Sequence, residues 1–288
     1  MSDENLAEIR NEKAKKIQHP KGKLTAYERL NLLLDEDSFS EIDQHVASEE
    51  NPEGEAVITG TGTIHGRPVF VFSEDFSVMG GSLGEVVAKK ILKIMDHALE
   101  ARAPIIGIKD SGGARIQEGI SSLFGYAQIF KKNVEASGKV PQISVVVGPS
   151  AGGAVYSPAL TDFIFQVKDI GQLYVTGPAV VKTVTGEDVT FEELGGIEAH
   201  GTKSGVTHQV CETEEQAFEE IRYLMSFLPQ SSSQKPPIFI TEDEPSRVIE
   251  SLDSFIPENR NQPYDMEKII FDIVHDGEHN PIQRNYAT

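Results

Sequence analysis

The sequence predicts an α/β domain, because strand-like apolar runs alternate with helix-like segments and three of the runs lead into a double glycine. Strands that alternate with helices favour a layered α/β domain over a β-sandwich or a helical bundle. Glycine lets a ligand approach the backbone closely, and the first N–H groups of a helix lack an internal partner, so each junction is a candidate oxyanion or phosphate site. The runs are residues 69–72, 105–108 and 143–147, and the glycine pairs are Gly80 and Gly81, Gly112 and Gly113, and Gly152 and Gly153.

Two helices are expected before the first of these junctions. Residues 6–17 have the composition of a polar helix. Thr25 is expected to begin a second helix, because residues 25–28 have the form of a capping box. This helix has an apolar stripe made of Leu30, Leu33 and Leu34.

The other elements follow from the same helix and strand periodicities. Residues 56–72 are expected to form a hairpin around His65 and Gly66. Serines followed by prolines at residues 231–237 are typical of a linker. Further helices are expected at residues 83–99, 121–134 and 215–228, and further strands at residues 163–165 and 173–175.

The composition is that of a globular cytoplasmic protein. The 288 residues are 39% hydrophobic and 25% charged, and no apolar stretch approaches the roughly 18 residues that span a membrane. Because the start at residues 1–5 is acidic and lacks an apolar core, it is not expected to act as a secretory signal or a transit peptide. A single cysteine, Cys211, excludes an internal disulfide and is expected to be structural in a reducing compartment.

The net charge of -19 argues against a nucleic-acid partner, because phosphate neutralisation drives such binding. Residues 10–29 depart from this balance, with seven basic and two acidic residues and a local net charge of +5. One interpretation is a solvated helix face. The other is a cationic rim for a ligand that carries several phosphates.

A second, incomplete repeat follows the linker. A shift of 240 positions aligns Leu30 with Ile270 and Leu33 with Ile273, and both apolar triplets precede an acidic turn. The repeat predicts one complete domain followed by the first helix of a similar domain.

Other motifs suggest competing chemistry. Residues 148–152 fit the Gly-x-Ser-x-Gly elbow of serine hydrolases, with Ser150 as nucleophile and Asp162 with His200 or His208 as partners. His275 and His279 have the spacing of a zinc pair but lack a third ligand, so no metal site is expected. Residues 196–204 imitate a phosphate-binding loop, but their lysine does not follow a glycine, so this interpretation is rejected.

Four motifs and an entry segment closely resemble the carboxyltransferase β subunit of biotin-dependent acyl-CoA carboxylases. The propionyl-CoA carboxylase type is the most similar, and the α subunit of biotin-dependent methylmalonyl-CoA decarboxylases is almost indistinguishable from it. The resemblance runs from about residue 13 to residue 273. The motifs are DFSVMGGSLGE at 75–85, DSGGARIQEG at 110–119, GPSAGGAVYSPA at 148–159 and TGPAVVKTVTGEDV at 176–189, and the entry segment is GKLTAYER at 22–29.

The resemblance implies a crotonase/ClpP-like fold of stacked ββα units that is used twice per chain, with acyl-CoA held by the first domain and biotin by the second. It also implies a homo-oligomer, a ring-shaped hexamer in the family, whose sites lie between the first domain of one subunit and the second domain of its neighbour. We therefore expect a truncated chain that needs a partner for full activity. The expected parts are a basic helical segment at 1–24, a crotonase-like acyl-CoA carboxyltransferase domain at 25–230, a linker at 231–262 and the start of a second, similar domain at 263–288.

The implied reaction moves a carboxyl group between carboxybiotin, which a partner carrier protein holds, and the α-carbon of a short-chain acyl-CoA, most simply between propionyl-CoA and methylmalonyl-CoA. Its enolate places charge on the thioester oxygen, which oriented N–H donors stabilise. The resemblance assigns this catalytic role to Gly152 and Gly153. Arg115 either orients the substrate or pairs with Glu118. The residues expected to bind substrate are Gly80, Gly81, Ser82, Ser111, Gly112, Gly113, Ala114, Arg115, Lys23 and Arg29.

Three alternatives remain open. The chain could act in the decarboxylase direction, or it could be an inactive remnant that binds acyl-CoA without turnover. A serine hydrolase is the third, and it would use Ser150 as its nucleophile. The expected partners of the favoured enzyme are its acyl-CoA substrate and a biotin carboxylase or biotin carrier subunit.

Overall fold

The computed structural model describes residues 3–244 and 246–287, which form two compact units. Of the described residues, 3–236 and 283–287 belong to unit 1, and those between 237 and 282 belong to unit 2. The boundary at residue 236 falls inside the segment that the sequence predicts as a linker, but residues 283–287 group with unit 1.

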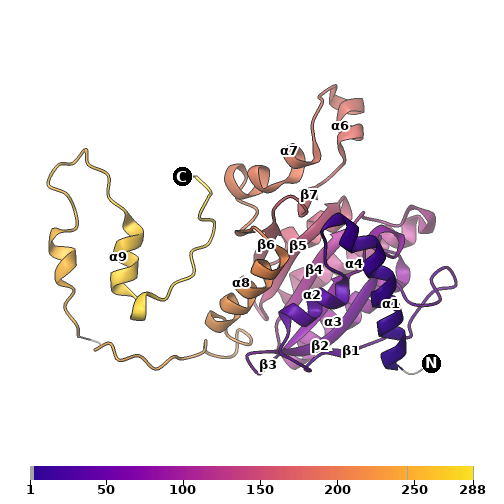
Figure 1. Cartoon of the computed structure of the whole chain (residues 1–288), viewed down its shortest axis with the longest axis horizontal. Helices are drawn as coiled ribbons and strands as arrows, with labels where there is room; N and C mark the ends of the chain where they lie inside the picture. The colour runs from indigo at the N-terminus through magenta and orange to yellow at the C-terminus, as the bar shows by residue number, and fades with distance from the viewer. Residues whose placement is uncertain (1–2, 245, 288) are drawn as a thin grey trace. The chain divides into compact units, whose positions relative to one another are not determined.

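Unit 1 is built on one eight-stranded sheet (Figure 1). The strand order is β1-β2-β3-β4-β5-β6-β8, and β7 pairs with the end of β5. The first three strands are antiparallel, and every pairing from β3 onward is parallel. The strands are β1 Ser40–Glu41, β2 Val57–Ile64, β3 Arg67–Glu74, β4 Ile105–Ser111, β5 Gln142–Ala151, β6 Phe163–Val167, β7 Gln172–Tyr174 and β8 Gln209–Cys211.

Helices cover both faces of the sheet because its strands are apolar on both sides. Val71 belongs to a core with α2 and α8, whereas its neighbour Phe72 belongs to a core with α3 and α4. Successive strand residues point to opposite faces, so the result is a three-layer α/β/α domain. The helices of unit 1 are α1 Asp3–Gln18, α2 Ala26–Leu33, α3 Glu85–Ala101, α4 Ile120–Ala136, α5 Gly153–Ala159, α6 Pro178–Thr185, α7 Phe191–Gly195 and α8 Glu214–Phe227. Shorter helical segments are η1 His19–Lys21, η2 Met79–Gly81, η3 Ile116–Glu118 and the π-helical η4 Glu198–Lys203.

The predicted elements of the first seventy residues are confirmed. Thr25 accepts a hydrogen bond from the Glu28 N–H at 3.2 Å, and the Glu28 carboxylate accepts one from the Thr25 N–H at 2.8 Å. β2 and β3 form the predicted hairpin, and His65 and Gly66 both have positive φ, as a tight two-residue turn requires. The other predicted helices and strands also form, with ends that shift by at most four residues.

Unit 2 contains α9 Met266–Ile273 and the short segments η5 Glu250–Ser254 and η6 His275–Gly277. Its helix reproduces α2 at the predicted shift of 240 positions. Both helices have eight residues, Thr25 and Asp265 cap their starts, and the N–H groups of Leu34 and Val274 close their ends on the residue four positions earlier. The apolar stripe is buried in α2 but exposed in α9, where the Ile270 and Ile273 side chains are 44% and 55% accessible.

Candidate functional site

The three glycine turns lie at one edge of the sheet. They follow β3, β4 and β5, which are parallel neighbours and so end on the same side. The first two turns are joined, because the Gly112 N–H donates to the Gly80 oxygen and the Leu83 N–H donates to the Gly113 oxygen, both at 2.9 Å. The second and third turns adjoin, because a methyl group added to Gly113 would lie 2.7 Å from the Ala151 oxygen. Ligands of open α/β sheets bind at this edge.

The third turn offers unpaired N–H donors, but not the pair that the sequence suggests. The Gly152 N–H donates to the Tyr174 oxygen of β7 at 3.1 Å and is therefore part of the sheet. Gly153 and Ala154 begin α5, and among the described residues no hydrogen bond uses their N–H groups. The candidate donors shift by one residue, from Gly152 and Gly153 to Gly153 and Ala154.

The second turn contributes one more open donor. The Gly113 N–H donates to the Ser111 hydroxyl at 3.1 Å, and the Gly112 N–H is bound to Gly80. Within residues 112–114, which the structure describes in full, only the Ala114 N–H has no acceptor. Ala114 is thus a better candidate donor than Gly112 or Gly113, whose N–H groups are already bonded within the protein.

The first turn is shaped by three successive residues in the left-handed region. Met79, Gly80 and Gly81 have φ values of 47°, 65° and 67°. A side chain on Gly81 would collide with the Asp110 oxygen, so this turn packs directly onto the end of β4. Ser82 continues the turn and meets Arg115.

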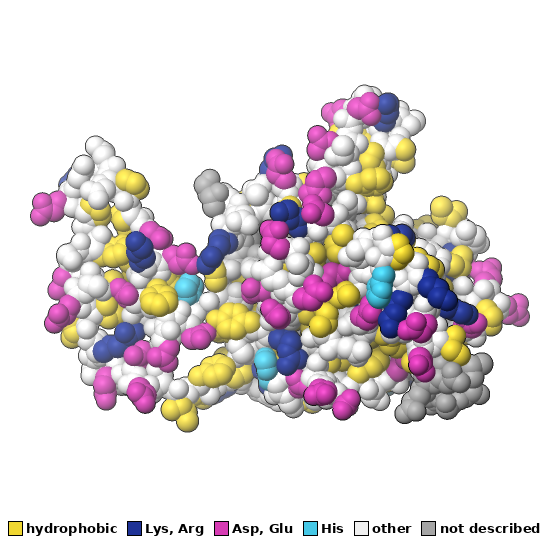
Figure 2. All heavy atoms as spheres, viewed as in Figure 1, with side chains coloured by type: hydrophobic (Ala, Val, Ile, Leu, Met, Phe, Trp, Pro, Cys, Tyr) yellow, Lys and Arg dark blue, Asp and Glu magenta, His cyan; other side chains and the backbone are white. Residues whose placement is uncertain are grey.

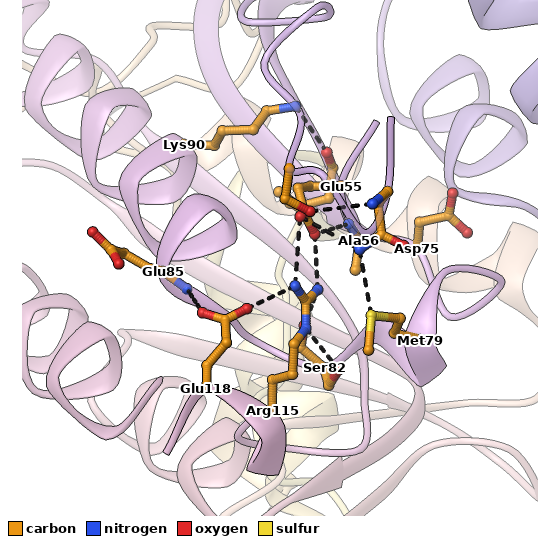
Figure 3. Close-up of polar contacts among 12 residues, drawn as sticks. Glu55, Ala56, Asp75, Met79, Ser82, Glu85, Lys90, Arg115 and Glu118 are labelled. Atoms are coloured by element: carbon orange, nitrogen blue, oxygen red, sulfur yellow. Dashed lines mark hydrogen bonds and ion pairs between the residues drawn. The ribbon is translucent and has the colours of Figure 1, made fainter. Parts of the chain in front are cut away.

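Arg115 is buried and ion-paired, as the second of its two sequence-based interpretations predicts (Figure 3). Its guanidinium pairs with Glu55 at 2.8 Å and with Glu118 at 2.8 Å, and it donates to the Ser82 oxygen at 3.3 Å. Burial alone would raise the pKa of Glu55, but the Arg115 contact lowers it below its usual value. The Glu118 carboxylate also accepts from the Glu85 N–H, so this cluster ties the first turn and the start of α3 to the second turn.

Lys23 and Arg29 also lie inside the protein, which contradicts their placement on a cationic rim. Arg29 is fully buried and pairs with Asp110 at 2.9 Å and with Glu214 at 2.5 Å. Lys23 pairs with Asp110 at 2.6 Å. Ion pairing and burial leave neither cation free for a ligand phosphate, and both instead stabilise the end of β4 beneath the second turn.

The serine-hydrolase alternative has no geometric support. Ser150 is fully buried, and among the described residues its hydroxyl has no hydrogen-bond partner. His200 bonds the Leu173 oxygen at 2.7 Å, and His208 accepts from the Ile164 N–H at 2.9 Å. A nucleophile needs a base within hydrogen-bond reach, and neither histidine is placed to serve Ser150.

Metal and thiol chemistry are no better supported. In residues 3–244 and 246–287 no three His, Cys, Asp or Glu side chains gather as a metal would require. His275 instead bonds Asp243 at 3.1 Å. Burial, with the nearby Glu220 carboxylate, raises the pKa of Cys211 to about 12, which agrees with its structural interpretation.

Two further features concern surfaces. A groove of about 670 Å³ lies between α3 and α4, with Leu92 and Phe124 among its lining residues. Among the helices that the structure describes, none is both long and apolar enough for a membrane span.

The chain belongs to the carboxyl transferase domain family, whose sequence profile matches residues 17–288. It is 52% identical over 278 residues to the propionyl-CoA carboxylase beta chain of Roseobacter denitrificans, covering 94% of this chain and 54% of that protein. It is 51% identical over 296 residues to the methylmalonyl-CoA decarboxylase subunit alpha of Veillonella parvula, covering 99% of this chain and 58% of that protein. The resemblance inferred from the glycine motifs is thereby confirmed.

Solved structures give the same result. Transcarboxylase 12S, described as a hexamer with methylmalonyl-coenzyme A and methylmalonic acid bound, superposes with a TM-score of 0.93 at 43% identity, over 99% of this chain and 58% of its own. The geranyl-CoA carboxylase beta subunit of P. aeruginosa matches with a TM-score of 0.72 at 27% identity, over 96% of this chain and 52% of its own. The fold is therefore the predicted crotonase-like fold, and the chain spans about half the length of the relatives it matches.

Proposed function

We propose that this chain is the acyl-CoA-binding half of a carboxyltransferase that acts on the α-carbon of a short-chain acyl-CoA. Family membership supports this proposal, as do relatives named propionyl-CoA carboxylase and methylmalonyl-CoA decarboxylase. The neighbour that contains methylmalonyl-coenzyme A supports the substrate class. We favour propionyl-CoA as the acceptor, and the decarboxylase relative supports the reverse direction as the second candidate.

The single observation that carries the proposal is the group of unpaired N–H donors at the glycine turns. The N–H groups of Gly153 and Ala154, with that of Ala114 on the adjoining turn, have no acceptor among the described residues. Loss of the α-proton or of the carboxyl group turns the thioester into an enolate whose charge collects on oxygen. Fixed N–H donors stabilise that charge, and removal of one such donor typically costs about 100-fold to 1000-fold in turnover.

Biotin on a partner chain would supply or accept the carboxyl group. We assign none of the residues described above to holding it, and infer that a second, similar domain does so. Exposed apolar side chains beside the second turn support such a covering domain, because exposed apolar patches mark interaction surfaces. They are Ile116, Ile120, Leu123 and Phe124, each more than 60% accessible.

We also infer the predicted division, with an acyl-CoA domain at residues 25–230 and the start of a similar domain at 263–288, in a homo-oligomer in the cytoplasm. The α2 and α9 correspondence supports the division, and the hexameric neighbour supports the assembly. Basic side chains lie among many acidic ones on the face shown in Figure 2, in line with the net charge of -19 and with a small-molecule rather than a nucleic-acid ligand.

Calorimetric titration of the purified chain with propionyl-CoA tests the proposal. We expect saturable binding with a Kd between about 1 µM and 1 mM. Because Lys23 and Arg29 are buried, added salt should lower the affinity for propionyl-CoA only slightly. The loss should be smaller than at an exposed site where several surface cations contact the phosphates. The absence of heat with propionyl-CoA and methylmalonyl-CoA, for a chain whose circular dichroism shows it to be folded, would contradict the proposal.

A further inference from the structure

Tyr126 lies directly beneath the third glycine turn. It is a residue of α4, and only 4% of its surface is accessible. A methyl group added to Gly153 would lie 2.6 to 2.8 Å from three carbons of the Tyr126 ring. Real side chains do not approach so closely, so the ring already occupies the space next to the Gly153 backbone. A methyl group on Gly152, by contrast, would come no closer than 3.8 Å to the Val175 oxygen.

The phenol end of the same side chain is buried as well, and no hydrogen bond of acceptable geometry reaches its oxygen from the described residues. Burial raises the pKa of the Tyr126 phenol, the Glu74 carboxylate raises it further, and Ser111 partly offsets both. Phe130 holds the ring from one helical turn away, with ring centroids 5.9 Å apart.

We propose that Tyr126 is a positioning residue that sets the direction of the Gly153 N–H. Its rigid, buried ring lies against the Gly153 backbone, so it acts as a spacer that fixes how closely the start of α5 approaches α4. A Leu in its place would let the turn at Gly153 settle toward α4. The inference rests on the proposed function, because the direction of the Gly153 N–H matters only if this group binds the thioester oxygen.

The test compares CoA with propionyl-CoA by calorimetry, because only the acyl-CoA has the thioester oxygen that the Gly153 N–H would bind. We expect the wild-type chain to bind propionyl-CoA more tightly than CoA. Tyr126→Leu should reduce this preference by roughly fivefold to tenfold, which corresponds to one hydrogen bond, while its CoA affinity changes by less than about twofold. Tyr126→Phe keeps the ring and should retain the full preference.

Tyr223→Leu is the matched control, since it makes the same change on α8, where the ring pairs with Phe227 rather than with Gly153 or Phe130, and it should keep the preference. Tyr126→Met serves as a second variant in case the Leu variant fails to fold. A preference that survives unchanged in a folded Tyr126→Leu or Tyr126→Met variant would overturn the inference, as would an equal loss in Tyr223→Leu. A folded wild-type chain that binds neither ligand would instead overturn the proposed function and this inference with it.

Discussion

The two adjacent glycines of the third turn are needed for different reasons. Gly152 has φ of 56° and ψ of -121°, a combination that side chains other than hydrogen strongly disfavour. Gly153 has no such backbone demand but meets the Tyr126 ring. The sequence suggests that both glycines leave room for a ligand, but the structure shows that the space beside Gly153 is filled from inside the protein.

Gly153→Ala tests this packing. The added methyl group would overlap the Tyr126 ring, so we expect the free energy of unfolding to fall by about 1 to 3 kcal/mol, as overpacking in a core typically does. Urea denaturation measures the change. Gly177→Ala is the control, because Gly177 has φ of -77° and a methyl group there makes only an ordinary contact with Phe191. Equal stability of Gly153→Ala and the wild-type protein would show that the ring does not occupy this space.

Lys90 gives a prediction that depends on pH. Burial on α3, with help from the Arg10 charge, lowers the pKa of Lys90 from 10.5 to about 8. Below pH 8 the lysine is charged in both states, and the folded protein carries the full cost of burying that charge. Between pH 8 and 10.5 the unfolded chain holds more protons, so the stability of the wild-type protein rises with pH. Above pH 10.5 Lys90 is neutral in both the folded and the unfolded state, so the cost of burying its charge disappears.

Lys90→Met should therefore be more stable than the wild-type protein at pH 7, by up to about 3 kcal/mol. The advantage should shrink as the pH rises from 8 to 10.5. Urea denaturation across this range is the measurement, and Lys89→Met, which changes an exposed neighbour paired with Glu85, should show no such trend. An advantage that stays constant with pH would indicate that Lys90 is not buried in its charged form.

At the scale of elements, one buried carboxylate joins the N-terminal helices to the sheet. Asp110 at the end of β4 accepts from Gln18 at the end of α1, from Lys23 before α2 and from Arg29 within α2. Arg29 continues to Glu214 at the start of α8. The basic segment at residues 10–29, which the sequence suggests is exposed, therefore contributes buried cations that hold α1 and α2 against the sheet.

Asp110→Asn should destabilise the protein by about 3 to 5 kcal/mol, because it leaves Lys23 and Arg29 buried with one negative charge fewer. We expect faster proteolysis within the first 30 residues, which mass spectrometry of limited digests can locate. Asp188→Asn removes the partner of Lys182 from an exposed ion pair and should change stability by less than about 1 kcal/mol. Equal effects of the two substitutions would argue against the buried network.

Local patterns predicted most of the fold, and long-range partners account for what they missed. The capping box at Thr25, the hairpin at Gly66 and the α9 repeat are visible in short stretches of sequence, because their causes lie within a few residues. Arg29 and Glu214 are 185 positions apart, and no local pattern indicates that they pair. For the same reason the sequence does not predict that Tyr126 packs against Gly153 or that the Gly152 N–H donates to the Tyr174 oxygen.

At the scale of the whole molecule, the chain spans about half of its relatives, and apolar surface is exposed in both units. We expect the isolated chain to bind acyl-CoA without transferring carboxyl groups, since positioning of the second reactant contributes roughly 7 to 11 kcal/mol to such reactions. Transfer of labelled carboxyl from methylmalonyl-CoA to biotin is the assay. Addition of a chain that corresponds to the second half of the relatives should restore turnover, and clear turnover by an isolated monomer would contradict the expectation.

A crystal structure of the chain with propionyl-CoA bound would test the glycine-turn site most directly. We expect the thioester oxygen to lie within about 3.2 Å of the Gly153 nitrogen, with the Ala154 or Ala114 nitrogen as a second donor. A thioester bound elsewhere, for example in the groove between α3 and α4 that Leu92 and Phe124 line, would contradict the central claim that the glycine turns hold the acyl-CoA.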